Sequence, residues 1–319
     1  MNYNILIYNP DYIEDYIELI PKFKELNNGN TTIKICENEM DLESYIREAD
    51  ILFVNQNFQT SLIHKAKKLK WIQLASAGVD SFMLNLENFS EKIVLTRVNT
   101  SFGEIMAEYA LGYMLALNQK IPLIIENQKN KIWKKLKLSW LCNQTLGIAG
   151  VGKIGHTIAK KAKFLGMNVL GYGRTEKHLD ELDNFYSINK LHEFLSLLDF
   201  LVITLPLTPQ TKGLFGQNEF KAMPESSYII NIARGAIIKE RELITALEKG
   251  YIKGAVLDVF EEEPLPKGNP LWDMDNVIVC PHHSGPSQPK EMIKYFIENL
   301  RRFERGETLE GVVNIQKGY

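Results

Sequence analysis

A glycine-rich turn in the middle of the chain restricts the possible folds more than any other feature. Gly150, Gly152 and Gly155 follow the apolar run LGIA and precede the helical pattern KIGHTIAKKAKFL. In this context the first glycine allows a tight turn, and the second lets the backbone approach a pyrophosphate. The N-terminus of the following helix is suited to bind the anion. We therefore interpret the turn as nucleotide-binding, in preference to a glycine turn that serves packing alone.

Short runs rich in β-branched residues alternate with helical patterns along the chain. The first series comprises NILIY, TTIKIC, ILFVN, WIQLA and IVLTRV, with helical patterns around residues 12–26, 41–48 and 60–68. The second begins with the helix candidate GEIMAEYALGYMLALNQK and continues through LGIAG, NVLGY, FLVIT, YIINIA, AVLDVF and NVIVC. Strands separated by helix-length segments predict parallel sheets with right-handed crossovers. We predict an α/β protein whose second series forms a doubly wound Rossmann dinucleotide-binding domain.

The end of the sequence predicts that one domain is discontinuous. A last helix is expected over residues 289–305, with no room after it for another domain. We expect this helix to pack back on the N-terminal strands. The predicted domains are 1–98 with 286–319, the smaller substrate (catalytic) domain, and 99–285, the dinucleotide-binding domain. Short hinges are expected near Asn99 and Gly285.

Composition limits the class of partner. Lys and Arg number 37 against 39 for Asp and Glu, so no overall positive charge attracts nucleic acid or an acidic membrane surface. Three widely spaced cysteines without a CxxC pair are expected to be reduced. The sequence contains no signal-peptide pattern and no apolar run of about 18 residues, the length that a membrane helix needs. We expect a cytoplasmic protein with a small-molecule partner and no metal site.

The segment KNKIWKKLKLSW carries five lysines and two tryptophans. Such a segment can form an amphipathic patch for nucleic acid or membrane. Because the chain has no net basic charge, we favour a solvated helix face with its tryptophans turned inward.

The residues after the second strand of this domain bear on the choice of cofactor. NAD-binding domains carry an acid there that accepts hydrogen bonds from the adenosine ribose. In this chain the expected position, 18 residues after Gly155, is Gly173, and Arg174 and Thr175 follow it. A glycine removes the carboxylate that would repel a 2′-phosphate, and a guanidinium and a hydroxyl can bind one. We therefore predict NADP(H) as the preferred cofactor, with NAD(H) possible.

Three polar residues follow in an order that suits carbonyl reduction. Arg234 comes at the end of the run YIINIA, and its planar guanidinium suits a carboxylate. His282 follows NVIVC, and an imidazole can donate a proton near neutral pH. Glu263, in the acidic run of DVFEEEPLP, is the candidate orienting partner of that imidazole. We interpret His283 as a bystander, because neighbours in an extended segment point to opposite faces.

These motifs carry a family resemblance. From Trp71 to Val313, through WIQLASAGVD, ARG, DVFEEEPLP and PHHSG, the chain resembles the D-isomer-specific 2-hydroxyacid dehydrogenases, and most of all their glyoxylate/hydroxypyruvate reductase branch. Residues 1–70 resemble only a divergent flavodoxin-like half. The resemblance implies NAD(P)H-dependent reduction of a small 2-oxo acid to the D-2-hydroxy acid. In that reaction Arg234 would bind and polarise the substrate, Glu263 would pair with His282, and His282 would be the general acid.

The resemblance also implies further contacts and a homodimer built largely on the long helix after Asn99. Backbone N–H groups at Ala77 and Gly78 would bind the substrate carboxylate, and Asp258 would contact the nicotinamide. Additional cofactor contacts are implied at Lys153, Ile154, Leu205, Pro206, Thr211 and Ile232. The chain departs from the usual family pattern at Gly173, which replaces an acid, and at His283, where an apolar residue is more usual.

Other functions stay open at this level. A nucleotide-sensing binding protein can keep the same fold without turnover, although it does not need the three polar residues. L-lactate and malate dehydrogenases are disfavoured, because about 145 residues precede the turn here. A phosphoglycerate dehydrogenase with a regulatory tail is disfavoured, because the sequence stops soon after the last helix. The substrate side chain is undetermined, so glyoxylate, hydroxypyruvate, pyruvate and bulkier oxo acids are all candidates.

Overall fold

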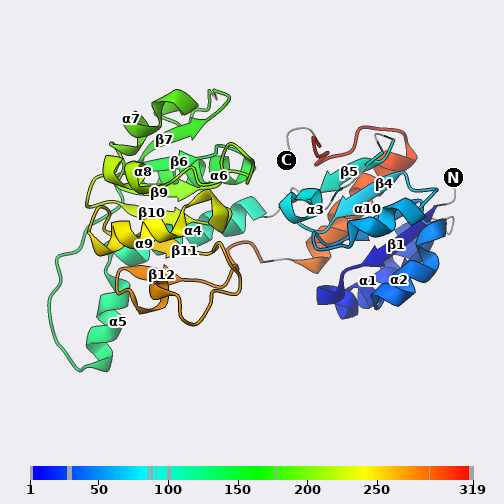
Figure 1. Cartoon of the computed structure of the whole chain (residues 1–319), viewed down its shortest axis with the longest axis horizontal. Helices are drawn as coiled ribbons and strands as arrows, with labels where there is room; N and C mark the ends of the chain where they lie inside the picture. Colours follow the sequence, from blue (N-terminus) through cyan, green and yellow to red (C-terminus); the bar gives the residue numbers. More distant parts are fainter. Residues whose placement is uncertain are drawn as a thin grey trace. The chain divides into compact units, whose positions relative to one another are not determined.

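The chain divides into two compact units. The computed structural model describes residues 3–26, 31–84, 86, 89–90, 92–98, 102–176, 178–286 and 288–315. Unit 1 comprises Met1–Ser101 with Ser287–Tyr319, and unit 2 comprises Phe102–Pro286 (Figure 1). The hinge predicted near Asn99 lies outside the described residues, and Gly285 belongs to unit 2. Among the described helices, none combines the length and the apolar character that crossing a bilayer requires.

Unit 1 contains a five-stranded parallel sheet in the order β2-β1-β3-β4-β5. This is the doubly wound order of flavodoxin-like folds. The register pairs Ile5 with Ile51 and Leu74 with Arg97. The strands are β1 (Asn4–Tyr8), β2 (Thr32–Ile35), β3 (Ile51–Val54), β4 (Trp71–Leu74) and β5 (Val94–Arg97).

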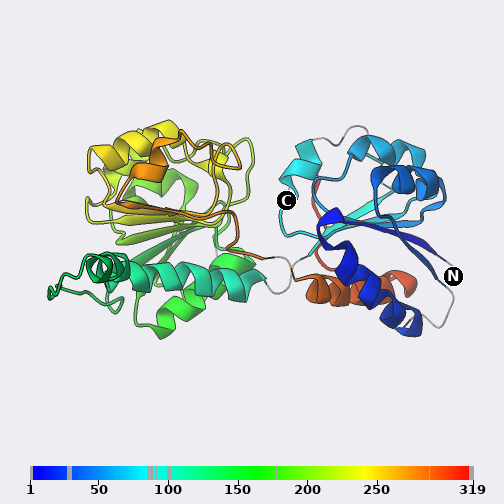
Figure 2. The ribbon, with the colours of Figure 1, turned by 90° about the horizontal axis from the view of Figure 1, so that it is seen from below.

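Helices cover both faces of this sheet, as Figure 2 shows. On one face α1 (Ile13–Leu26) contacts α10 (Pro289–Glu304), so a helix from the end of the chain completes the N-terminal fold. Aromatic contacts hold α10 there, with 5.1 Å between the ring centroids of Trp71 and Phe296. The other helices are α2 (Glu39–Tyr45) and α3 (Asp80–Leu84). The helix expected over 60–68 is a 3₁₀ segment, Thr60–Lys65.

Unit 2 contains a seven-stranded parallel sheet in the order β12-β11-β10-β9-β6-β7-β8. The direction of winding reverses between β6 and β9, which confirms the predicted doubly wound Rossmann domain. The strand β8 was not anticipated, because its sequence NFYS has no continuous apolar run. The strands are β6 (Thr145–Ala149), β7 (Asn168–Gly173), β8 (Asn184–Ser187), β9 (Phe200–Ile203), β10 (Tyr228–Asn231), β11 (Gly254–Leu257) and β12 (Val277–Val279).

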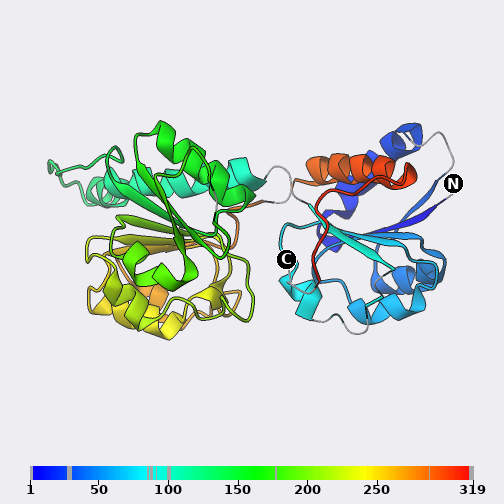
Figure 3. The same cartoon turned by 90° about the horizontal axis from the view of Figure 1, so that it is seen from above.

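The helices of unit 2 lie in two layers around its sheet (Figure 3). On one face α4 (Phe102–Asn118) packs against α6 (Lys153–Phe164). On the other face α8 (Gln217–Ala222) contacts both α7 (Leu191–Leu195) and α9 (Glu240–Glu248). The buried apolar side chains of this layer give the sheet its core. The remaining helix, α5 (Ile121–Lys129), follows α4 directly.

The prediction for the lysine-rich segment is wrong. The helix α5 ends at Lys129, and Lys131 adopts a left-handed backbone with φ of 57°, which breaks the helix. The following residues form neither helix nor strand as far as Trp140. The side chain of Trp133 is 98% exposed and that of Trp140 is 77% exposed, so both tryptophans point outward.

Candidate active site

The glycine turn lies at the point where unit 2 reverses its winding. Gly150 has φ of +102°, and a Cβ there would lie 2.8 Å from the backbone nitrogen of Leu205. A Cβ at Gly155 would lie 2.4 Å from the carbonyl oxygen of Gly150. Both positions therefore require glycine, one for the turn and one for close packing of helix on strand.

The second glycine of the turn leaves space for a ligand. A Cβ at Gly152 would meet nothing within 4 Å among the described atoms. Gly152 is also the N-cap of α6, with no side-chain cap on the helix. The first N–H groups of a helix point outward without intrahelical partners, and the helix dipole favours an anion there. The residues present therefore fit a dinucleotide pyrophosphate.

The other predicted cofactor residues surround this turn along the edge of the sheet. Lys153 and Ile154 form the first turn of α6. Leu205, Pro206 and Thr211 lie in the loop after β9, where the Thr211 hydroxyl donates to the Pro206 carbonyl over 2.6 Å. The Thr204 hydroxyl donates to the Gly150 carbonyl over 2.6 Å, which ties that loop to the turn. Ile232 is buried just after β10.

The end of β7 carries no acid at the expected position. Gly173 is the last residue of the strand, and Arg174 and Thr175 follow it with exposed side chains. A Cβ at Gly173 would meet only the Phe185 ring, at 3.4 Å, which is an ordinary contact. Packing therefore does not exclude a larger side chain at residue 173. The absence of an acid changes the chemistry of the end of β7 and is not required by its packing.

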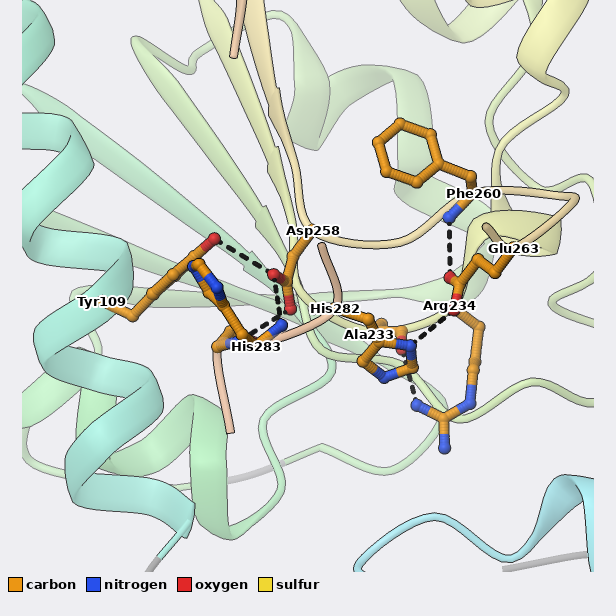
Figure 4. Close-up of polar contacts among 9 residues, drawn as sticks. Tyr109, Ala233, Arg234, Asp258, Phe260, Glu263, His282 and His283 are labelled. Atoms are coloured by element: carbon orange, nitrogen blue, oxygen red, sulfur yellow. Dashed lines mark hydrogen bonds and ion pairs between the residues drawn. The ribbon is translucent and has the colours of Figure 1, made fainter. Parts of the chain in front are cut away.

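Glu263 and His282 form a close ion pair in unit 2, as Figure 4 shows. The Nδ1 atom of His282 lies 2.7 Å from Oε2 of Glu263. The other carboxylate oxygen, Oε1, accepts a hydrogen bond from the Phe260 N–H at 2.9 Å. The carboxylate is thus anchored by the backbone on one side and orients the imidazole on the other. Both side chains keep part of their surface exposed, 44% for His282 and 35% for Glu263.

The pair shifts both pKa values toward the charged forms. The hydrogen bond and charge of Glu263 raise the pKa of His282, against the opposing effects of burial and of Arg234. Burial alone would raise the pKa of Glu263, but the hydrogen bonds from His282 and from the Phe260 N–H lower it below its ordinary value. The imidazole therefore holds its proton to higher pH than an isolated histidine does.

Arg234 approaches this pair from the end of β10. Its carbonyl accepts a hydrogen bond from Nδ2 of buried Asn231 at 3.1 Å. A Cβ on the next residue, Gly235, would lie 1.9 Å from the Phe260 carbonyl carbon, so only glycine lets the two loops meet. The Arg234 guanidinium donates to the Ala233 carbonyl at 2.7 Å (Figure 4). Arg234, Glu263 and His282 are thus brought together, while Asp258 faces another group.

Asp258 is fully buried and holds the segment that carries His282. Its carboxylate accepts hydrogen bonds from the N–H groups of His283 and Ser284 and from the Tyr109 hydroxyl, at 2.9, 3.0 and 3.1 Å. Its carbonyl accepts the His282 N–H. These contacts support a left-handed backbone at His282, where φ is 48°. Tyr109 was not predictable from the sequence, because nothing in a helical pattern indicates a partner 149 residues away.

The two neighbouring histidines point to different groups, but not for the reason expected from the sequence. The segment is not extended at His282, since its backbone is left-handed. The ring of His283 packs edge-on against Tyr109, with 5.5 Å between ring centroids. Figure 4 shows this ring on the Asp258 side of the segment, away from Glu263.

In unit 1, Ala77 and Gly78 lie in the loop after β4, at the carboxyl end of that strand. Their backbone N–H groups have no hydrogen-bond acceptor among the described residues. The loop is only partly buried, so these two groups are available to an anion.

Residues 111–284 match the family described as D-isomer specific 2-hydroxyacid dehydrogenase, NAD binding domain. The chain belongs to this family. The match covers the glycine turn as well as Arg234, Glu263 and His282. A nicotinamide dinucleotide is therefore the class of cofactor that this domain binds.

Two relatives and one solved structure show the similarity over longer stretches. The chain is 35% identical over 98% of its length to D-3-phosphoglycerate dehydrogenase of Methanocaldococcus jannaschii, but spans only 59% of that relative. It is 32% identical to glyoxylate/hydroxypyruvate reductase A of Klebsiella pneumoniae, over 80% of this chain and 83% of that one. The NADPH-dependent glyoxylate/hydroxypyruvate reductase of Sinorhizobium meliloti, solved with NADP and sulfate, is 27% identical. That alignment has a TM-score of 0.89 and covers 99% of this chain and 100% of the other.

Proposed function

We propose that the protein is a reductase of small 2-oxo acids that prefers NADPH and forms the D-2-hydroxy acid. The observation that carries this proposal is the imidazole of His282, which lies 2.7 Å from Glu263 and beside Arg234, and whose pKa is raised by Glu263. A proton donor beside a guanidinium suits a carbonyl next to a carboxylate. The names of the similar reductases support the same substrate class.

The bound cofactor would supply the hydride, and the chain's own residues would manage the charge that develops. The guanidinium of Arg234 binds the substrate carboxylate and polarises the carbonyl oxygen, since its planar fork makes two parallel hydrogen bonds. Because Nδ1 of His282 is engaged by Glu263, Nε2 is the atom that delivers the proton to the carbonyl oxygen. Glu263 then stabilises the imidazolium before transfer and sets the orientation of the ring. The N–H groups of Ala77 and Gly78 are assigned to the substrate carboxylate.

The preference for NADPH rests on the end of β7. A carboxylate there would repel a 2′-phosphate, and this chain has Gly173 instead, followed by Arg174. We expect Arg174→Ala to weaken NADPH binding by about 1.5–3 kcal/mol, the usual contribution of a hydrogen bond to a charged group. NADH binding should barely change. Fluorescence titration of both cofactors measures this, with Arg241→Ala, another exposed arginine of unit 2, as the control. Equal losses of affinity for NADPH and NADH would show that Arg174 does not bind the 2′-phosphate.

The pairing of Glu263 with His282 predicts a pH effect. Because Glu263 raises the pKa of His282, the acid form persists to higher pH in the native enzyme. Glu263→Gln keeps the size of the side chain but removes its charge, so the pKa of His282 falls. The alkaline limb of the pH profile of kcat/KM for reduction should then move to lower pH. The Gln variant should lose less activity at acidic pH than near neutral pH. An alkaline limb that stays in place would show that Glu263 does not tune the proton donor.

We further propose that the exposed apolar surface of unit 2 pairs two copies of the chain. This surface consists of α5 and residues 131–140, which Figure 1 shows at one end of unit 2. Large exposed apolar patches are typical of interfaces, and the family resemblance implies a homodimer. Its exposed large side chains are Ile121, Leu123, Ile124, Ile125, Ile132, Trp133, Leu138 and Trp140.

Replacing Trp133 and Trp140 together by serine tests this interface. We expect the native protein to have twice the chain mass of 36.6 kDa in light scattering, and the double variant to dissociate at micromolar concentration. The matched control is Trp272→Ser, because Trp272 is another exposed tryptophan, at 51%, but lies outside the segment. A double variant that stays dimeric would place the interface elsewhere.

Steady-state oxidation of NADPH with a substrate panel tests the function itself. The panel comprises glyoxylate, hydroxypyruvate, pyruvate, a bulkier 2-oxo acid and 3-phosphohydroxypyruvate. The proposal predicts turnover of at least one small unphosphorylated acid, faster with NADPH than with NADH. Turnover of the phosphorylated acid alone would indicate a phosphoglycerate dehydrogenase, the activity named for the Methanocaldococcus jannaschii relative. Cofactor binding without any turnover would favour a nucleotide-sensing protein.

A further inference from the structure

Three consecutive carbonyl groups of the loop after β4 in unit 1, at residues 76–78, accept hydrogen bonds from the protein. The Ser76 carbonyl accepts the Val98 N–H at 3.0 Å. The Ala77 carbonyl accepts a hydrogen bond from Nη1 of Arg97 at 2.8 Å. The Gly78 carbonyl accepts the hydroxyl of Ser76 at 2.7 Å. The N–H groups of Ala77 and Gly78, in contrast, have no acceptor among the residues that the structure describes.

Peptide geometry links the position of Arg97 to the direction of one of these N–H groups. The Ala77 carbonyl and the Gly78 N–H belong to the same planar peptide unit, and in a trans peptide they point in opposite directions. A guanidinium that holds the carbonyl therefore directs the Gly78 N–H away from Arg97. Without that hydrogen bond, the peptide plane could rotate and the N–H would lose its fixed direction.

Arg97 is itself held firmly by its own strand. It is the last residue of β5, its backbone pairs with Leu74 of β4, and its N–H donates to the Gly311 carbonyl at 3.0 Å. The preceding residue, Thr96, joins a buried network in which it donates to Oε1 of Gln73 at 2.8 Å and accepts from the Trp71 indole at 2.7 Å. The base of the guanidinium is therefore fixed relative to β4 and its loop.

The charge of Arg97 is not neutralised by a carboxylate among the described residues. Its side chain is partly buried, and none of the ion pairs of the described chain includes it. Burial lowers the pKa of Arg97 from its high ordinary value, which leaves a guanidinium charged at neutral pH. A cation with no acidic partner next to two free N–H groups favours an anion at this loop.

We propose that Arg97 is a positioning residue for the substrate carboxylate, which rests on the proposed function. It holds the Ala77 carbonyl so that the Gly78 N–H points at the carboxylate, and its charge adds to the attraction. The chemical group recognised is a carboxylate next to the reacting carbonyl, so Arg97 acts on substrate binding and leaves cofactor binding and proton transfer to other residues.

The test compares Arg97→Met and Arg97→Lys with the native enzyme and with Arg47→Met, an exposed arginine of the same unit. The readouts are KM and kcat for the best 2-oxo acid, the inhibition constant of oxamate, the dissociation constant of NADPH and the melting temperature. We expect Arg97→Met to raise KM and the oxamate constant by about tenfold or more, the effect of one charge-assisted hydrogen bond. The expected fall in kcat is smaller. The dissociation constant of NADPH and the limbs of the pH profile of kcat/KM should not change.

Arg97→Lys carries the test if the Met variant does not fold. Lysine keeps the charge and much of the stem but lacks the planar fork, so a smaller rise in KM and in the oxamate constant is expected. Native-like values in a folded variant would overturn the proposal while the proposed function stands. So would a loss that affects NADPH binding as strongly as oxamate binding. A native enzyme that neither turns over a 2-oxo acid nor binds oxamate would overturn the proposed function and this proposal with it.

Discussion

Replacing His282 by alanine is expected to slow the reduction of 2-oxo acids by about 10²–10⁴-fold, the range for losing a positioned general acid. The imidazole is oriented by a 2.7 Å contact with Glu263, which also raises its pKa, so the native side chain is aimed and keeps its proton to higher pH than an isolated histidine does. Rapid-mixing measurements of the reduction step would separate this loss from any change in product release. NADPH binding should be nearly unchanged, because the glycine turn lies elsewhere on unit 2.

The neighbouring histidine provides a matched control for this variant. The ring of His283 packs on Tyr109, and its contact with Asp258 uses the backbone N–H. His283→Ala should therefore keep most of the activity. If His283→Ala were inactive and His282→Ala active, the role of proton donor would pass to the other imidazole.

The second large effect is expected at Arg234. Arg234→Lys keeps the charge but loses the planar fork, so the carboxylate and the carbonyl can no longer be gripped together. We expect KM to rise and kcat to fall together, with kcat/KM lower by about 10²-fold, the cost of small misplacements of reacting groups. Steady-state kinetics with the best substrate of the panel measure both constants.

The outcome at Arg234 also distinguishes a structural from a chemical role. Its carbonyl is tied to Asn231, and Gly235 packs closely on the Phe260 backbone, so the loop does not depend on the guanidinium alone. The Lys variant should therefore melt near the native temperature. Near-native kcat/KM in this variant would mean that Arg234 serves packing and does not act on the substrate.

The parts of the molecule that were predictable from the sequence follow from local constraints. The glycine turn requires its residues for steric reasons that act over a few positions, as the close approaches at Gly150 and Gly155 show. Strands buried on both faces read as continuous apolar runs, which is why β6 and β9 were identified. The strand β8 lacks such a run and is paired on one side only, so it carries no comparable signal.

The features that were missed depend on contacts between distant residues. The hydroxyl of Tyr109 reaches Asp258 only because α4 crosses the end of β11. The contact of Arg97 with Ala77 exists because the carboxyl ends of β4 and β5 lie side by side. The tryptophans of the lysine-rich segment were expected inside because large apolar side chains usually are, yet Trp133 and Trp140 are exposed. Periodicity cannot show whether such side chains face a core or another surface.

The most direct test of the central claim follows the hydride itself. Native enzyme is incubated with hydroxypyruvate and with NADPH that carries two deuterium atoms at C4 of its nicotinamide ring. The product is examined by NMR and by chiral chromatography. We expect glycerate of the D configuration that carries one deuterium at C2, formed in step with the oxidised cofactor. Product without deuterium at C2, product of the L configuration, or bound NADPH that is never consumed by any acid of the panel would contradict it.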